Sequence, residues 1–99
     1  MRITFERSGG FAGMRLRATV QTAALPAEEA REIEALVAAA DFFNLPPILS
    51  APRPGADRFQ YEITVEDGAR SHTVRVDEAA VPATLQPLLR RLTRMASWG

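Results

Sequence analysis

The stretch FQYEITVEDGARSHTVRV, residues 59–76, decides the fold because it contains two alternating runs joined by a turn signal. Apolar side chains occupy every second position from Phe59 to Val65, and the alternation resumes from His72 to Val76. Between the two runs, Asp67-Gly68 is a sequence typical of tight β-turns. These residues therefore predict a β-hairpin that has one apolar face and one polar face.

A second hairpin is expected at the start of the chain. Apolar and polar residues alternate over residues 1–6 and again over residues 14–21. The segment between them, residues 8–13, holds three glycines, which readily adopt the positive φ angles that a hairpin loop requires.

Two helices are expected, one after each hairpin. A proline, an acidic pair and an apolar stripe predict a helix over residues 26–41, and Pro46-Pro47 prevents further helix beyond it. A stripe of leucines predicts the second helix. That helix starts near Thr84 with Pro87 in its first turn, or at Pro82 with a kink at Pro87.

The order β-β-α-β-β-α predicts an α+β fold in which two helices pack on one face of a four-stranded, mainly antiparallel sheet. The 99 residues suffice for one modest core, so residues 1–99 are expected to form a single domain. If each element runs antiparallel to the one before it, three irregular connections meet at one end of the domain. They are residues 8–13, residues 46–56 and residues 77–83.

Composition excludes several classes of function. The 12 basic and 12 acidic residues give no net charge, which argues against a protein dedicated to binding nucleic acid. No cysteine is present, so the chain forms no disulfide and no thiolate site. The N-terminus lacks an apolar leader, and no apolar run is long enough to cross a membrane. We therefore expect a soluble, cytoplasmic protein that does not bind membranes, with export alongside a partner left open.

The sequence offers few residues that could form a catalytic site. One histidine alone makes neither a catalytic dyad nor a metal site, and His72 alternates with valines as a structural histidine would. The aromatic pair Phe42-Phe43 is expected in the core. Arg90, Arg91 and Arg94 are explained first by the negative end of the helix dipole. We therefore expect no enzyme, no cofactor and no metal site.

Phe11 at the tip of the first hairpin has two possible roles. It either folds back over the core or projects as an anchor into a partner, and the sequence leaves both open. In the second case the loops at that end would form a wedge.

Three segments of the chain, residues 5–13, residues 40–46 and residues 55–68, resemble the emfourin family. Emfourins are small bacterial protein inhibitors of thermolysin-like zinc metallopeptidases, and are often encoded beside a protealysin-like target. The resemblance implies a non-covalent inhibitor that blocks the substrate cleft of such a peptidase. We expect the free protein to be a monomer. An alternative is a non-inhibitory interaction module, or a propeptide-like folding assistant for a peptidase.

The resemblance assigns no roles to single residues, so candidate partner contacts come from the expected geometry. They lie in or directly beside the three connections that are expected to share one end. A carboxylate of Asp77 or Glu78 that reaches the zinc of the partner is a minor option. The candidates are Gly9, Gly10, Phe11, Ala12, Gly13, Pro52, Arg53, Pro54, Asp57, Asp77, Glu78 and Pro82.

Overall fold

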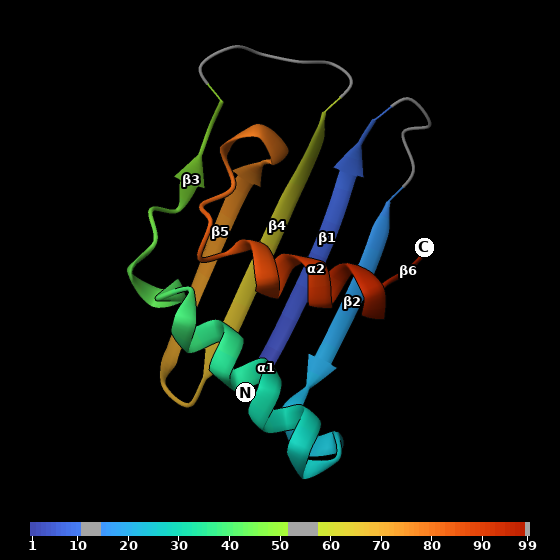
Figure 1. Ribbon diagram of the computed structural model, residues 1–99, viewed down its shortest axis with the longest axis vertical. Coiled ribbons are helices and arrows are strands. Elements are labelled where there is room, and N and C mark those ends of the chain that lie inside the picture. Colours follow the sequence, from blue (N-terminus) through green and yellow to red (C-terminus); the bar gives the residue numbers. More distant parts are fainter. Residues whose placement is uncertain (11–14, 52–57, 99) are drawn as a thin grey trace.

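The protein is an α+β structure in which a twisted sheet carries two helices on one face (Figure 1). The structure is a computed structural model that describes residues 1–10, 15–51 and 58–98. The helices are α1 (Ala27–Ala39) and α2 (Gln86–Met95). Three short 3₁₀ helices join the larger elements: η1 (Thr22–Ala24), η2 (Phe42–Asn44) and η3 (Glu78–Ala80).

Four long strands form the centre of the sheet, and the pairings among these four are all antiparallel. They lie in the order β5-β4-β1-β2. The expected pair of hairpins is therefore present, with the N-terminal strand of each hairpin in the middle of the sheet. The strands are β1 (Arg2–Gly9), β2 (Leu16–Gln21), β4 (Phe59–Asp67) and β5 (Arg70–Asp77).

The expected number of strands was too small. Within the described residues the sheet has six strands, because β3 (Ile48–Leu49) pairs with β5 and β6 (Ser97–Trp98) pairs with β2. The β3 pairing is parallel, so the sheet is mixed. Each added strand has only two residues, and alternation of side chains needs a longer run to be visible in a sequence.

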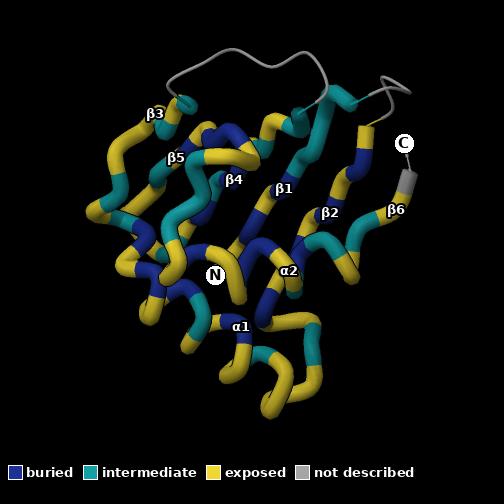
Figure 2. The backbone as a smooth tube through the Cα atoms, turned by 45° about the horizontal axis from the view of Figure 1, so that its top comes forward, coloured by how far each residue is buried: buried dark blue, intermediate teal, exposed yellow. Residues whose placement is uncertain are grey.

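The core lies between the sheet and the helices. Residues on β1 and β2 alternate between buried and exposed (Figure 2), as expected for a sheet covered on one face. The opposite face carries polar and charged side chains. The largest fully buried side chains come from β1, β4 and β5, both helices and the segments beside the helices: Phe5, Phe42, Ile3, Ile33, Ile63, Leu85, Leu88, Leu92, Val65, Val74 and Val76.

Both helices begin close to the predicted positions. Pro26 lies immediately before α1, and two glutamates occupy the first turn, where they complement the helix dipole. Helix α2 begins at Gln86, so Pro87 lies in the first turn and needs no kink. No helix in the described ranges is long and apolar enough to cross a bilayer.

His72 and Phe42 confirm the structural roles expected of them. The Nε2 atom of His72 lies 2.7 Å from the carbonyl oxygen of Leu45, and its ring meets the Phe42 ring edge to face. Phe42 is buried, whereas Phe43 is partly buried and packs against the core. These contacts fix the chain after α1 against β5 and bring it to the β3 edge.

The strand directions bring one end of four strands together. The ends of β1 and β5 and the starts of β2 and β4 lie at the same edge, at the top of Figure 1. Gly9 is paired with Phe59 across β1 and β4, and Gln60 is paired with Asp77 across β4 and β5. The β4–β5 turn lies at the opposite edge.

Candidate partner-binding site

The shared edge contains part of the expected partner-binding site. We use the term loop pole for the six described residues Gly9, Gly10, Arg58, Phe59, Asp77 and Glu78. Four of the expected candidates, Gly9, Gly10, Asp77 and Glu78, belong to it. Seven others lie outside the described residues: Phe11, Ala12, Gly13, Pro52, Arg53, Pro54 and Asp57.

Pro82 lies farther along the chain, in the connection from η3 to α2. Its carbonyl oxygen accepts hydrogen bonds from the backbone nitrogens of Leu85 at 3.0 Å and Gln86 at 3.2 Å. These bonds form the turn from which α2 starts. Pro82 therefore helps to position α2, and no described contact joins it to the loop pole.

Asp77 connects the end of β5 to the start of β4 and to η3. Its Oδ1 atom accepts hydrogen bonds from Arg58 Nε at 2.9 Å and from the backbone nitrogen of Ala79 at 2.8 Å. Its Oδ2 atom accepts a third bond from Gln60 Nε2 at 2.8 Å. The side chain is nearly buried, with 7 % of the residue exposed. One carboxylate thus holds the start of β4 and the first turn of η3.

These bonds also set the charge state of Asp77. The Ala79 backbone N–H lowers the pKa of the carboxyl group most, and Gln60 and Arg58 lower it further, against the opposing effect of desolvation. Asp77 is therefore held as a carboxylate, the form that accepts all three hydrogen bonds.

Glu78 holds the next residue of β4. Its Oε1 atom accepts a hydrogen bond from the backbone nitrogen of Phe59 at 2.7 Å. Asp77 at the end of β5 and Glu78 at the start of η3 therefore together hold residues 58–60, where β4 begins. Both carboxylates are engaged by this chain itself, which favours a positioning role over contact with a metal of the partner. Within the described ranges, no group of three or more His, Asp or Glu residues could hold a metal ion.

The side chain of Phe59 packs against Arg7 of β1 and against Gly10. The guanidinium carbon of Arg7 lies 4.1 Å from the centre of the Phe59 ring, a cation–π contact. A Cβ atom on Gly10 would lie only 2.7 Å from the ring, and a Cβ atom on Gly9 would lie 2.7 Å from the carbonyl oxygen of Arg58. Backbone packing therefore requires glycine at position 9, whereas a side chain at position 10 would displace the Phe59 ring.

Tyr61 extends the contacts of Phe59 and Arg7 toward α2. It stacks on Phe5 with ring centres 6.0 Å apart and accepts a hydrogen bond from the Arg7 side chain. Burial raises the pKa of its phenol, and the negative charge of Glu78 raises it further, while Arg7 opposes both effects. Tyr61 is therefore neutral at physiological pH and links the loop pole to the helical layer.

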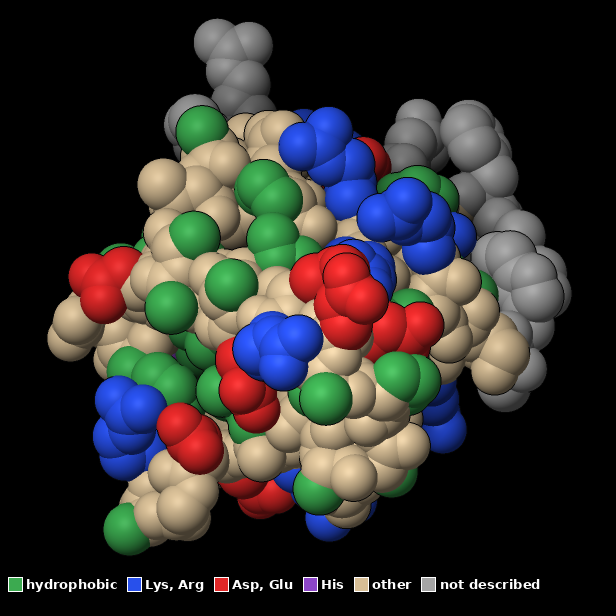
Figure 3. All heavy atoms as spheres, turned by 60° about the horizontal axis from the view of Figure 1, so that its bottom comes forward, with side chains coloured by type: hydrophobic (Ala, Val, Ile, Leu, Met, Phe, Trp, Pro, Cys, Tyr) green, Lys and Arg blue, Asp and Glu red, His purple; other side chains and the backbone are tan. Residues whose placement is uncertain are grey.

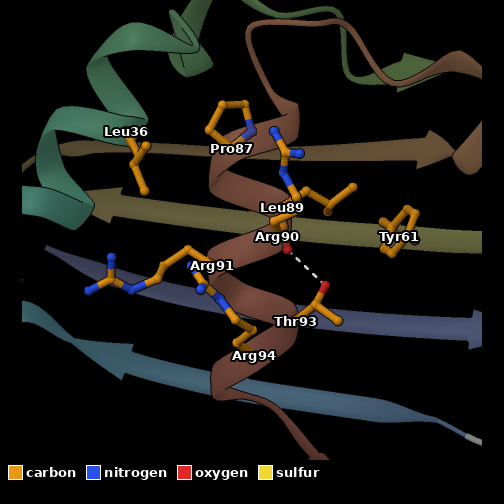
Figure 4. Close-up of a pocket in the computed structure, with 8 residues that line it drawn as sticks. All are labelled: Leu36, Tyr61, Pro87, Leu89, Arg90, Arg91, Thr93 and Arg94. Carbon is orange, nitrogen blue, oxygen red and sulfur yellow. Dashed lines mark hydrogen bonds between the residues drawn. The ribbon is translucent and has the colours of Figure 1, made fainter.

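A hollow of about 740 Å³ extends over α2, and Figure 4 shows the side chains that line it. Tyr61, Leu89 and Thr93 lie on one side of the helix, and Leu36 of α1 lies on the other. The remaining lining residues are Pro87, Arg90, Arg91 and Arg94. The hollow is open and has no catalytic pair, so its chemistry is that of a contact surface.

A comparison with protein families finds a match over most of the chain. The family model Emfourin matches residues 5–93 of the 99-residue chain. The chain belongs to the emfourin family. Emfourins are peptidase inhibitors, so membership points to inhibition of a peptidase rather than to catalysis by this emfourin. No curated protein and no solved structure matches the chain.

Sequence reasoning missed five residues of this site: Arg7, Arg58, Phe59, Gln60 and Tyr61. The alternation of β4 already indicated that Tyr61 faces the core and Gln60 the other face. The partners of these residues, however, depend on which residue of β5 lies opposite, and the sequence did not give that register.

Proposed function

We propose that this emfourin is an inhibitor of thermolysin-like zinc metallopeptidases that blocks the substrate cleft non-covalently with the loops attached to the loop pole. The observation that carries the proposal is the convergence of the ends of β1, β4 and β5, held together by Asp77 and Glu78. Loops that leave such a fixed frame have lost part of their conformational freedom before binding.

The proposed contacts are the candidates in the connections at this edge, with Phe11 as the anchor in an apolar subsite. A fixed frame also disfavours cleavage, because attack on a peptide bond needs that bond in the geometry of the reaction. The frame residues Asp77 and Glu78 act indirectly in this proposal, by presenting the loops. The proposal includes a free monomer that works in the cytoplasm.

The test is a titration of the purified protein against a panel of thermolysin-like zinc metallopeptidases, with hydrolysis of a peptide substrate as the readout. We expect loss of activity at one inhibitor per peptidase. Phe11→Ala should weaken inhibition by more than about 1 kcal/mol, a usual threshold for an anchor residue. Phe43→Ala is the matched control, because Phe43 packs on Arg70 beside the opposite edge of the sheet.

Absence of inhibition across the panel would refute the proposal. Co-purification with a peptidase or its precursor, without any loss of mature activity, would instead favour the interaction module or folding assistant. Equal effects of Phe11→Ala and Phe43→Ala would refute the assignment of the anchor while leaving inhibition in place.

A further inference from the structure

We infer that α2 provides a second contact surface for the same peptidase, and that this surface recognises carboxylates on the partner. We call it the α2 shoulder, which consists of Tyr61, Leu89, Arg90 and Arg94. The inference rests on the proposed function and extends it from the loops to the helical layer.

The α2 shoulder is continuous with the loop pole. A hollow of about 170 Å³ is lined by Glu78 of the loop pole together with Tyr61, Leu89 and Arg90. The same three residues also line the hollow of about 740 Å³ over α2. Tyr61 follows Phe59 by two positions on β4, which corresponds to about 7 Å along a strand. A partner seated on the loop pole therefore lies directly beside this surface.

The charges of α2 favour an acidic partner surface. Arg91 already pairs with Glu32 of α1, with 3.0 Å between Nη1 and Oε2. Arg90 and Arg94 are exposed, and no described carboxylate lies within 4.0 Å of either side chain. The hollow over α2 that both arginines line also includes the half-buried Tyr61 and the buried Leu89. Two unpaired guanidinium groups beside apolar side chains suit a protein surface that offers carboxylates.

The surrounding charges argue against a nucleic acid as the partner. Figure 3 shows acidic side chains among the basic ones on this side of the molecule, and the Arg91–Glu32 pair brings an acidic residue of α1 next to α2. A phosphate backbone would meet repulsion there, whereas a protein surface can place a few carboxylates opposite Arg90 and Arg94 alone. The chain also has no net positive charge.

The expected size of the interface agrees with a second surface. A standard interface takes about 800 Å² from each partner and involves 20 to 30 residues. The described surface totals 6058 Å², so such an interface would cover about one-eighth of it. The three connections, residues 8–13, 46–56 and 77–83, hold 24 residues, so an interface at the upper end of that range would also reach the α2 shoulder. The α2 shoulder adds residues without a gap between the two surfaces.

The test compares two charge-reversal variants in association kinetics with a thermolysin-like peptidase that the wild type inhibits. The first is the Arg90→Glu/Arg94→Glu double variant. The matched control is Arg2→Glu/Arg31→Glu, which changes the net charge equally at exposed arginines of β1 and α1. Circular dichroism verifies that both variants are folded.

We expect the Arg90→Glu/Arg94→Glu variant to associate at least tenfold more slowly at low ionic strength, with the difference shrinking as salt is added. The control should stay within about twofold of wild type. Full inhibition at saturating concentration should persist, because the loops still block the cleft. Equal rates for the two variants would overturn this inference alone, while failure of the wild type to inhibit would overturn the proposed function with it.

Discussion

At the scale of single residues, the loop pole depends on one aspartate that has no catalytic or metal-binding neighbours among the described residues. Asp77 accepts hydrogen bonds from two side chains and one backbone N–H, and it is nearly buried. Removal of its charge would leave Arg58 and Gln60 with weaker acceptors. Hydrogen bonds to a charged group contribute more than neutral ones, so even an isosteric amide should loosen the frame.

This leads to a prediction for Asp77→Asn that depends on pH. The pKa of Asp77 in the folded protein lies below the ordinary aspartate value of about 3.9, so the carboxylate stabilises the fold above that pH. The stabilisation is lost as pH falls through the lower, folded pKa. The variant should therefore be less stable than wild type from about pH 5 to 7, and the difference should shrink below about pH 4.

Urea unfolding at a series of pH values measures this difference. Asp67→Asn serves as the control, because Asp67 forms an exposed ion pair with Arg70 at 3.2 Å, and such pairs contribute about 0 to 1 kcal/mol. A stability difference between wild type and Asp77→Asn that is constant from pH 7 to pH 2 would contradict the role assigned to the carboxylate.

At the scale of elements, two ends of the strands require glycine. Gly9 and Gly68 both have a positive φ, 92° and 61°, at opposite edges of the sheet. A Cβ atom on Gly68 would meet nothing within 4 Å, whereas a Cβ atom on Gly9 would lie 2.7 Å from the Arg58 carbonyl oxygen. The two glycines therefore share the conformational requirement, and only Gly9 adds a steric one.

We predict that Gly68→Ala costs about 1 to 2 kcal/mol of unfolding free energy, the cost of a left-handed conformation for alanine. Gly9→Ala should cost clearly more, because the backbone of β4 must also shift away from the new methyl group. Chemical denaturation of the two variants checks the ranking. Equal losses of unfolding free energy would show that the close approach of β1 and β4 at the loop pole adds no further cost to the Gly9→Ala substitution.

The same elements show what the sequence could predict and what it could not. Alternation over whole strands predicted both hairpins, and the apolar stripes predicted both helices to within about two residues. The register of the second hairpin was not predicted. The two turn residues are Gly68 and Ala69, since Asp67 pairs with Arg70. A turn centred on Asp67-Gly68 would shift the partner of Gln60 from Asp77 to Arg75. The hydrogen bond between Gln60 and Asp77 was therefore not apparent from the sequence.

At the scale of the whole molecule, the two faces of the sheet have different chemistry. One face packs against α1 and α2, and the other carries ion pairs of β1 with β2 and of β4 with β5. Arg17 pairs with Glu6 at 3.2 Å, and Arg75 pairs with Glu62 at 3.0 Å. These side chains are 36 to 71 % exposed, so their charges keep their hydration better in water than against a second protein surface.

We therefore predict that the free protein is a monomer, as an inhibitor that binds one peptidase should be. Stacking of two open faces would desolvate the paired charges, and desolvation of an ion pair costs more than its attraction returns unless the geometry is very good. Light scattering after size-exclusion chromatography should give a mass near 10.9 kDa at high protein concentration and over a wide range of salt. A mass twice as large would contradict the prediction, and its dependence on Glu62→Gln would identify the open face as the interface.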